Sequence, residues 1–171
     1  MPRYVAFLRG VSPMNAKMPE LKRVFEGAGF SNVKTVLSSG NVVFDSRAKS
    51  ETALARQVEK AMEENLDRTF LTIVRSTAAL RELIDADPYS AFKLPAKSKR
   101  VITFLRKAPT AKLALPLKLN HARILAVRGQ EVMTSYVPSP GAPEFMRLIE
   151  KTFGTDITTR TLDTVKKCAA A

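Results

Sequence analysis

The spacing of apolar residues changes several times along the first half of the chain, between strand-like and helical patterns. Residues 3–11 are apolar at both parities around Tyr4–Leu8, which predicts a strand whose two faces are both buried. Apolar residues then recur with the helical period over residues 18–28, with Pro19 in the first turn and Gly29 just beyond the last. This pattern predicts a buried strand followed by an amphipathic helix.

The next segment repeats the alternation of strands and helices. Ser50 precedes a long helical pattern and suits its N-cap, because its hydroxyl can accept a hydrogen bond from a backbone N–H of the first turn. Ser39–Asn41 is the turn of a predicted hairpin. The predicted strands and helix lie at residues 33–38, 41–45, 50–67 and 70–74. With the first two elements they give the order β-α-β-β-α-β of a ferredoxin-like unit.

The second half follows the same order with weaker periodicity. A short helix over residues 76–85 precedes a polar, proline-containing stretch at 86–99, which we interpret as a linker. Pro116 interrupts the helix predicted over residues 110–119. The other strands and helices are predicted at residues 101–105, 124–127, 132–137, 143–153, 157–160 and 161–170.

We therefore expect an α+β protein in which two ferredoxin-like subdomains form one compact molecule. The first is predicted to span residues 1–85 and the second residues 100–171, with residues 86–99 as the linker. A length of 171 residues and an apolar fraction of 45% are enough to fill such a core.

The composition excludes several classes of protein. No stretch approaches the roughly 18 uncharged apolar residues of a membrane-spanning helix, and the residues after Met1 lack the apolar run of a signal peptide. Cys168 is the one cysteine, so neither an internal disulfide nor a cysteine-rich metal site is expected. These features predict a cytoplasmic protein that does not bind membranes, with no cofactor and no metal.

Basic residues are concentrated in the second half. The net charge is +12 in total; residues 1–96 hold 14 basic and 11 acidic residues, and residues 97–171 hold 14 and 5. The stretch 88–130 has ten lysines and arginines and no acidic residue. Such a field favours polyanions, nucleic acid first among them, although a basic surface can also serve solubility. The candidate nucleic-acid contacts are Lys97, Lys99, Arg100, Arg106, Lys107 and Arg128.

A second candidate site follows from the predicted topology. The first and second strands of a ferredoxin-like unit run parallel, with the third antiparallel between them. The end of the first strand then lies beside the start of the third, which places Arg9 and Gly10 next to the Ser39–Asn41 turn. A guanidinium beside exposed backbone N–H groups can bind an anion. The alternative is a plain hairpin turn beside a surface arginine.

Catalytic patterns are sparse. His121 is the one histidine, and we interpret it as an exposed residue of a basic turn. No nucleophile–base motif, zinc-protease motif or phosphate-binding glycine loop occurs. The strand order is also that of an RNA-recognition motif, but the aromatic residues of the two central strands, Tyr4, Phe7 and Phe44, are expected in the core rather than on a base-stacking platform.

Four segments together carry a family resemblance. They are the opening RYVAFLRGV, the helix that follows Met18–Leu21, SSGNVVFDS, and DITTR followed by a Thr-Val pair. In this combination and order they resemble a bacterial family, domain of unknown function 1697, over nearly the whole chain. The resemblance implies a pair of ferredoxin-like subdomains and no established activity. The retained residues form the candidate anion site: Arg9, Gly10, Lys17, Ser39, Gly40, Asn41, Thr159 and Arg160.

The chain departs from the family pattern in two places. The loop Ser12–Lys17 lacks the two glycines that the family usually carries there. Near the end, Leu162 stands where the family usually has tryptophan, and Thr161 and Asp163 stand where it has asparagines. A ligand held by those residues in the family would be lost or bound differently here.

Three functions are compatible with the sequence. The first is a non-enzymatic binding module for an anionic ligand, with nucleic acid as the leading candidate. The second is an enzyme acting on a phosphorylated or carboxylated small molecule oriented by Arg9, Lys17 and Arg160, although no base or nucleophile is evident. The third is a protein-interaction module with a basic docking face. The sequence leaves the oligomeric state open.

Overall fold

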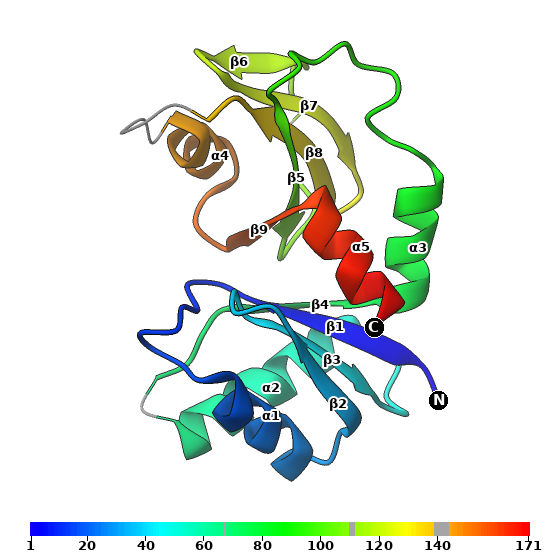
Figure 1. Cartoon of the computed structure of the whole chain (residues 1–171), viewed down its shortest axis with the longest axis vertical. Helices are drawn as coiled ribbons and strands as arrows, with labels where there is room; N and C mark the ends of the chain where they lie inside the picture. Colours follow the sequence, from blue (N-terminus) through cyan, green and yellow to red (C-terminus); the bar gives the residue numbers. More distant parts are fainter. Residues whose placement is uncertain (67, 110–111, 139–143) are drawn as a thin grey trace. The chain divides into compact units, whose positions relative to one another are not determined.

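The chain forms a mixed α/β protein built from two units. In the computed structural model, the described residues contain two antiparallel sheets and five helices (Figure 1). Internal contacts divide the chain into unit 1, residues 1–85 with 166–171, and unit 2, residues 86–165. The structure describes residues 1–66, 68–109, 112–138 and 144–171.

Unit 1 contains a four-stranded sheet with the order β2-β3-β1-β4, in which every neighbouring pair is antiparallel. Its elements are β1 (Arg3–Leu8), α1 (Met18–Gly27), β2 (Ser31–Val36), β3 (Asn41–Asp45), α2 (Glu51–Asn65), β4 (Thr72–Ser76) and α3 (Thr77–Asp85). The last residues of α5 (Leu162–Ala170) also belong to this unit. The strand and helix order predicted for residues 1–85 is present, with boundaries that differ by a few residues.

The core of unit 1 lies between the sheet and helices α1 and α2, which cover one of its faces (Figure 1). The ring of Phe44 on β3 is central: its centroid lies 4.4 Å from that of Phe30 and 5.6 Å from that of Phe25. All of Tyr4–Leu8 is buried, which confirms that both faces of β1 are covered. Tyr4, Phe7 and Phe44 are core residues, as predicted, and no base could stack on them.

Local sequence sets the helix ends of unit 1. The Ser50 hydroxyl accepts a hydrogen bond of 3.1 Å from the N–H of Ala53, which confirms it as the N-cap of α2. Pro19 lies in the first turn of α1, where a missing N–H leaves no helical bond unmade. Gly29 has a φ of 98°, so the chain can leave the helix through the left-handed region.

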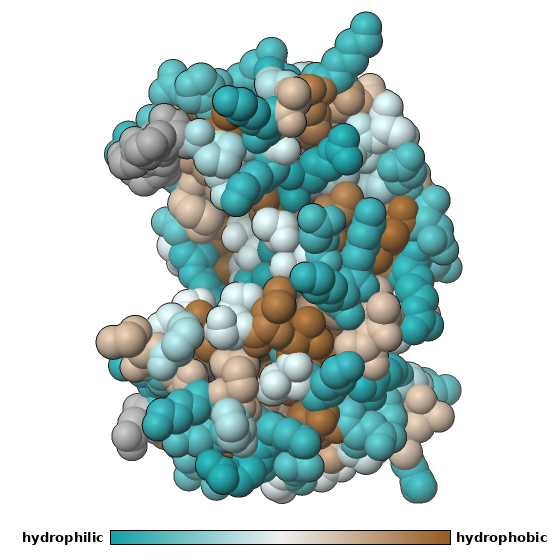
Figure 2. All heavy atoms as spheres, in the orientation of Figure 1, coloured by the Kyte–Doolittle hydropathy of each residue, from teal (hydrophilic) through white to brown (hydrophobic). Residues whose placement is uncertain are grey.

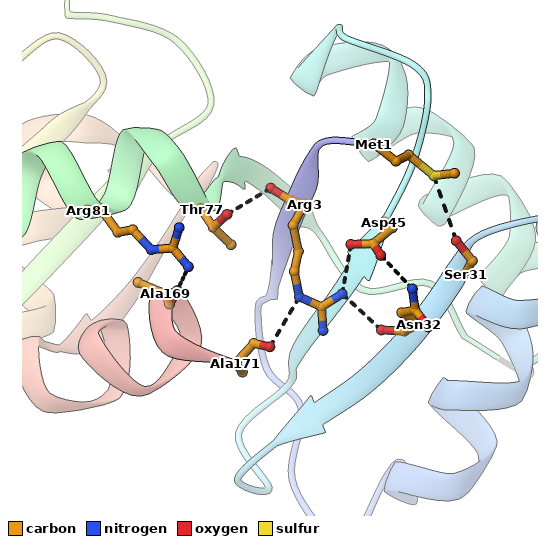
Figure 3. Close-up of polar contacts among 9 residues, drawn as sticks. All are labelled: Met1, Arg3, Ser31, Asn32, Asp45, Thr77, Arg81, Ala169 and Ala171. Carbon is orange, nitrogen blue, oxygen red and sulfur yellow. Dashed lines mark hydrogen bonds and ion pairs between the residues drawn. The ribbon is translucent and has the colours of Figure 1, made fainter.

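Arg3 joins several segments at the start of β1 (Figure 3). Its guanidinium donates to the Asp45 carboxylate (2.8 Å), to the carbonyl of Asn32 (3.0 Å) and to that of Ala171 (3.1 Å). The Asn32 amide donates to the second Asp45 oxygen at 2.7 Å. Burial by itself would raise the pKa of Asp45, but these hydrogen bonds and the charges of Arg3 and the chain's amino terminus outweigh it and lower the pKa.

A second arginine also binds the segment of residues 166–171, which includes Ala171. Arg81 on α3 donates to the carbonyl of Ala169 at 3.0 Å (Figure 3). Cys168 in this segment is fully buried. Residues 166–171 are therefore fixed to unit 1 by two guanidinium groups and by the burial of apolar side chains.

Unit 2 contains a five-stranded sheet with the order β6-β7-β8-β5-β9, again antiparallel throughout. Helix α4 packs against one face of this sheet (Figure 1), and its Ile149 is fully buried among Leu105, Ile124, Val132 and Ile157. Its elements are β5 (Lys99–Leu105), β6 (Leu117–Leu119), β7 (Ala122–Arg128), β8 (Glu131–Tyr136), α4 (Glu144–Phe153) and β9 (Ile157–Thr161).

The helix predicted over residues 110–119 is wrong for the residues that the structure describes. Residues 112–116 are irregular, and residues 117–119 form the edge strand β6. Pro116 has no N–H to donate, and its ring disfavours the helical conformation at Leu115. Residues 110–111 lie outside the described part of the chain, as do Asp67 and Pro143, where two other predicted helices end or begin.

The division into units differs from the predicted one in two places. Residues 86–99 belong to unit 2, where the Tyr89 side chain is 2% exposed and its hydroxyl lies 2.7 Å from the carbonyl of Val101. A buried tyrosine makes this stretch part of a core and not only a linker. Residues 166–171, expected in the second subdomain, belong to unit 1 because of the contacts made by Arg3 and Arg81.

One face of the molecule is mainly polar. Hydrophilic residues cover most of the face drawn in Figure 2, and the apolar ones are interspersed among them. In the described part of the chain, no helix has the length and apolar character needed to cross a membrane.

Candidate functional site

The predicted anion rim of unit 1 is partly assembled. The N–H of Leu8 donates to the carbonyl of Gly40 at 2.8 Å, and Phe7 pairs with Asn41 across β1 and β3. Arg9 and Gly10, which follow β1, therefore lie beside the Ser39–Asn41 turn as the topology predicts. Arg9 is half-buried, and its own N–H donates to the carbonyl of Leu71 at 2.9 Å.

The turn itself is built for structure. The side chain of Asn41 is fully buried, and its amide nitrogen donates to the carbonyl of Val36 (2.9 Å) and to the Ser39 hydroxyl (3.0 Å). Gly40 has a φ of 86°, and a Cβ there would lie 2.8 Å from that of Val11. Both amide hydrogens of Asn41 are therefore used to hold the turn, so this side chain cannot also donate to a ligand.

The remaining members of the predicted anion set are spread over the chain. Lys17 is exposed at the N-cap position of α1 in unit 1. Thr159 and Arg160 lie on β9 in unit 2, where the Arg160 guanidinium donates to the hydroxyl of Thr158 and the carbonyl of Thr159, both at 2.7 Å. Neither unit contains the whole set.

The predicted nucleic-acid contacts divide into two groups at opposite ends of the unit 2 sheet. Lys97, Lys99 and Arg100 lie just before or at the start of β5, and Arg106 and Lys107 follow its end. Arg128 joins the second group through the β7–β8 turn, because the Gln130 amide donates to the carbonyl of Arg106. An acidic residue, Glu131, pairs with Arg128 in the sheet register at that end.

Four residues form a row across the strands near the end of the sheet where β5 starts. We name it the basic row. The register pairs Lys118 with Arg123, Arg123 with Ser135, and Ser135 with Arg100. Directly opposite residues of antiparallel strands project from the same face, with Cβ atoms about 5 Å apart. Three cations and one hydroxyl are thus aligned across β6, β7, β8 and β5.

The cations of the basic row can be reached from solvent. Arg100 and Lys118 are exposed and Arg123 is half-buried, whereas Ser135 is buried beneath them in the sheet. Lys118 lies between two half-buried leucines in β6. Its pairing with Arg123, and the place of both in the row, escaped prediction because β6 was taken for part of a helix.

A buried tyrosine positions one end of the row. The guanidinium carbon of Arg100 lies 6.0 Å from the ring centroid of Tyr89, within the range of a cation–π contact. The Tyr89 hydroxyl lies 2.7 Å from the carbonyl of Val101 and 3.0 Å from that of Thr134. Burial raises the pKa of Tyr89 far above its ordinary value, although those hydrogen bonds and Arg100 act in the opposite direction.

Groups that could support catalysis or bind a metal are scattered. His121 is exposed in the turn before β7, as predicted. Within the described ranges, no group of three or more His, Cys, Asp or Glu side chains could hold a metal ion.

The chain is similar to known proteins in sequence family and in fold. The family model described as Protein of unknown function (DUF1697) matches residues 1–132. The conserved bacterial protein SP0830 from Streptococcus pneumoniae has a similar structure, with a TM-score of 0.71 and 19% sequence identity over 99% of this chain and 97% of that chain. At that identity, the likeness shows the fold and nothing more. No curated protein matches the chain.

Proposed function

Because this chain belongs to the DUF1697 family of proteins of unknown function, its role must be inferred from its own surface, and we propose that unit 2 binds the backbone of nucleic acid through the basic row. The observation that carries the proposal is the register that sets Lys118 opposite Arg123 and brings Arg100 into the same row. It supports the non-enzymatic binding module expected from the charge of the second half.

Like charges at directly opposite positions destabilise an antiparallel pair. Lys118 on the edge strand β6 and Arg123 on the neighbouring β7 occupy such a pair. An anion that lies between them removes the repulsion and makes the arrangement favourable. Phosphate oxygens are suited to this role, since arginine and lysine both bind them through charge-assisted hydrogen bonds.

The dimensions of the row fit a polymer of phosphates. Neighbouring strands lie about 4.8 Å apart, so a row across four strands spans roughly 15 Å. In a duplex, successive phosphates of one strand are spaced by about 3.4 Å along the helix axis. With three cations, the row can contact about three phosphates of one strand, without reading its base sequence.

The proposal is tested by fluorescence anisotropy with labelled single- and double-stranded DNA and RNA oligonucleotides. We expect binding whose affinity falls steeply between about 50 and 200 mM salt, because each phosphate contact releases counterions. The double variant Arg100→Ala/Arg123→Ala should reduce the salt slope by about 1.4 for a single strand and weaken binding roughly 25-fold at about 0.1 M salt.

A charge-matched control separates the row from net charge. Arg23→Ala/Arg68→Ala removes two exposed arginines from unit 1 and lowers the net charge equally. We expect this control to keep nearly full affinity. Equal losses in both double variants, or no binding at the lower salt concentration, would contradict the proposal. If oligonucleotides do not bind but the protein captures an acidic protein, the result would favour the protein-docking alternative.

We also propose that both units are ferredoxin-like. Unit 1 has the strand order β2-β3-β1-β4, and unit 2 has the equivalent order β7-β8-β5-β9 with β6 added at the edge. In unit 2, β6 and the irregular residues before it occupy the chain position of the first helix. The shared order supports a common plan in which the second unit has exchanged a helix for an edge strand.

A further inference from the structure

Unit 1 contains an open cavity of about 690 Å³ beside α1 and the end of α2. Its size lies within the range of about 300–1,000 Å³ that is usual for small-molecule sites. Ala16, Leu21 and Val24 supply apolar lining, and Arg23 and Arg68 also line it. We propose that this cavity binds a small organic anion, an apolar body that carries a phosphate or a carboxylate.

The two guanidinium groups supply the charge. Arg23 lies on α1 and Arg68 follows α2, and both are exposed. Within the described part of the chain, neither side chain has a hydrogen-bond or ion-pair partner. Glu20 also lines the cavity, so among the described lining residues two guanidinium groups stand against one carboxylate. Arginine binds phosphate and carboxylate oxygens in a fork, which suits an anionic head group.

The apolar part of the lining supplies the second half of the recognition. Leu66 is half-buried and lines the cavity, so it offers apolar surface that a ligand can reach, whereas Leu21, Ala16 and Val24, at 0%, 8% and 7% exposed, are almost wholly covered by the protein itself. Met14, which is 94% exposed, also lines the cavity. Its flexible thioether can adapt to a ring and make a favourable sulfur–aromatic contact.

One wall of the cavity is fixed before any ligand binds. The Asn15 side chain donates to the carbonyl of Gly10 at 2.8 Å and accepts from the N–H of Ser12 at 2.9 Å. These bonds hold the loop that carries Met14 and Ala16 in one conformation. A pre-formed wall lowers the entropy lost on binding. This loop is also where the chain lacks the family's usual glycines.

The cavity and the basic row differ in what they can recognise. The row is a line of cations on a sheet, which suits a polymer, whereas the cavity is concave and combines apolar and charged groups. The cavity therefore selects for a ligand that has both features. A ligand with charge but no apolar body, or an apolar body but no charge, should bind more weakly.

The full chain is titrated with four probes, and binding is followed by backbone amide shifts in ¹H–¹⁵N NMR spectra. Phenyl phosphate and benzoate carry both features, inorganic phosphate carries only charge, and phenol carries only the ring. We expect the better of the first two to bind at least about tenfold more tightly than phosphate or phenol. The shifts should map to residues 14–27 and to Asn65, Leu66 and Arg68. Tighter binding of phenyl phosphate or of benzoate identifies the head group.

The double variants serve as reciprocal controls. Arg23→Ala/Arg68→Ala should weaken binding of the tighter-binding probe to the cavity at least about tenfold. Arg100→Ala/Arg123→Ala should leave the affinity of the cavity for this probe unchanged. An unchanged thermal midpoint of both variants confirms folding. The absence of shifts at the cavity residues, or an affinity measured at those residues that stays within about twofold in Arg23→Ala/Arg68→Ala, would overturn the proposal. Because oligonucleotide binding is measured separately, failure of the cavity and failure of the basic row are distinguishable.

Discussion

The central strand pair of each unit is stabilised by a different kind of side chain. In unit 1, Tyr4 on β1 faces Phe44 on β3, and their rings stack with centroids 5.9 Å apart. In unit 2, Val101 on β5 faces Thr134 on β8, and the Thr134 hydroxyl donates to the Val101 carbonyl at 2.6 Å. Equivalent strands are thus joined by aromatic packing in one unit and by buried hydrogen bonds in the other.

This difference has a consequence for the surface. Apolar packing is non-directional, whereas a satisfied network of buried hydrogen bonds fixes the positions of its members. The unit 2 network includes Thr103, whose hydroxyl lies 3.2 Å from that of Thr134, and the hydroxyl of Tyr89. Because the ring of Tyr89 lies beside Arg100, the same network that orders the sheet also places one cation of the basic row.

The largest expected effect tests the aromatic core of unit 1. Phe44→Ala removes a fully buried ring that contacts three others, and should lower the free energy of unfolding of unit 1 by about 3–5 kcal/mol. Native-state hydrogen exchange measures this on the amides of β1 and β3, with those of β5 and β8 as the internal reference. An equal loss in both sets would show that the two units unfold together and would remove the contrast.

A smaller effect tests the polar cluster around Asp45 in unit 1. Asp45→Asn weakens the bonds from Arg3 and Asn32 and should cost about 1–2 kcal/mol at pH 7. The folded state lowers the pKa of Asp45, so its stabilisation is present above the unfolded value of about 3.9 and is lost as the pH falls through the folded value.

Urea unfolding at pH 7 and at about pH 3 checks this, because the difference between wild type and Asp45→Asn should shrink as the carboxylate is protonated. Glu63→Gln, on the exposed face of α2, is the control and should show little difference at either pH. A difference for Asp45→Asn that stays constant with pH would mean that the charge of Asp45 is irrelevant.

The smallest expected effect tests the polar network of unit 2. Tyr89→Phe keeps the ring beside Arg100 but removes the buried hydroxyl, and should destabilise unit 2 by about 1 kcal/mol. Exchange of the β5 and β8 amides should report the loss while oligonucleotide affinity stays within about twofold. A variant as stable as wild type would show that the hydroxyl does not contribute to unit 2.

Much of the fold could be predicted from local patterns. The helix with Leu21, Val24 and Phe25 on one face, the cap at Ser50 and the buried strand Tyr4–Leu8 all follow from periodicity and side-chain chemistry. The strand β6 could not be predicted, because three residues are too few to show alternation. The burial of Tyr89 could not be predicted either, since its partners are the carbonyls of distant strands.

The candidate sites were harder to predict, because they depend on register. The excess of basic residues indicated a partner, but the row requires Lys118 to face Arg123, and the register shifts between Ile124 and Ala126 on the next strand pair. The cavity is lined by both Arg23 and Arg68, which are far apart in sequence and reach the same cavity only through the packing of the fold. The Ser39–Asn41 turn was expected to offer backbone N–H groups to an anion; the structure adds that the side-chain amide of Asn41 holds this turn.

The attachment of residues 166–171 to unit 1 also sets an order of events during synthesis. The contacts of Arg3 with Ala171 and of Arg81 with Ala169 join positions 168 and 88 residues apart. A ribosome adds about 5–20 residues per second, so Arg81 waits roughly 4–18 seconds for its partner to be made. Unit 2 is completed within that interval. Unit 1 therefore gains these contacts only after the whole of unit 2, residues 86–165, has been synthesised.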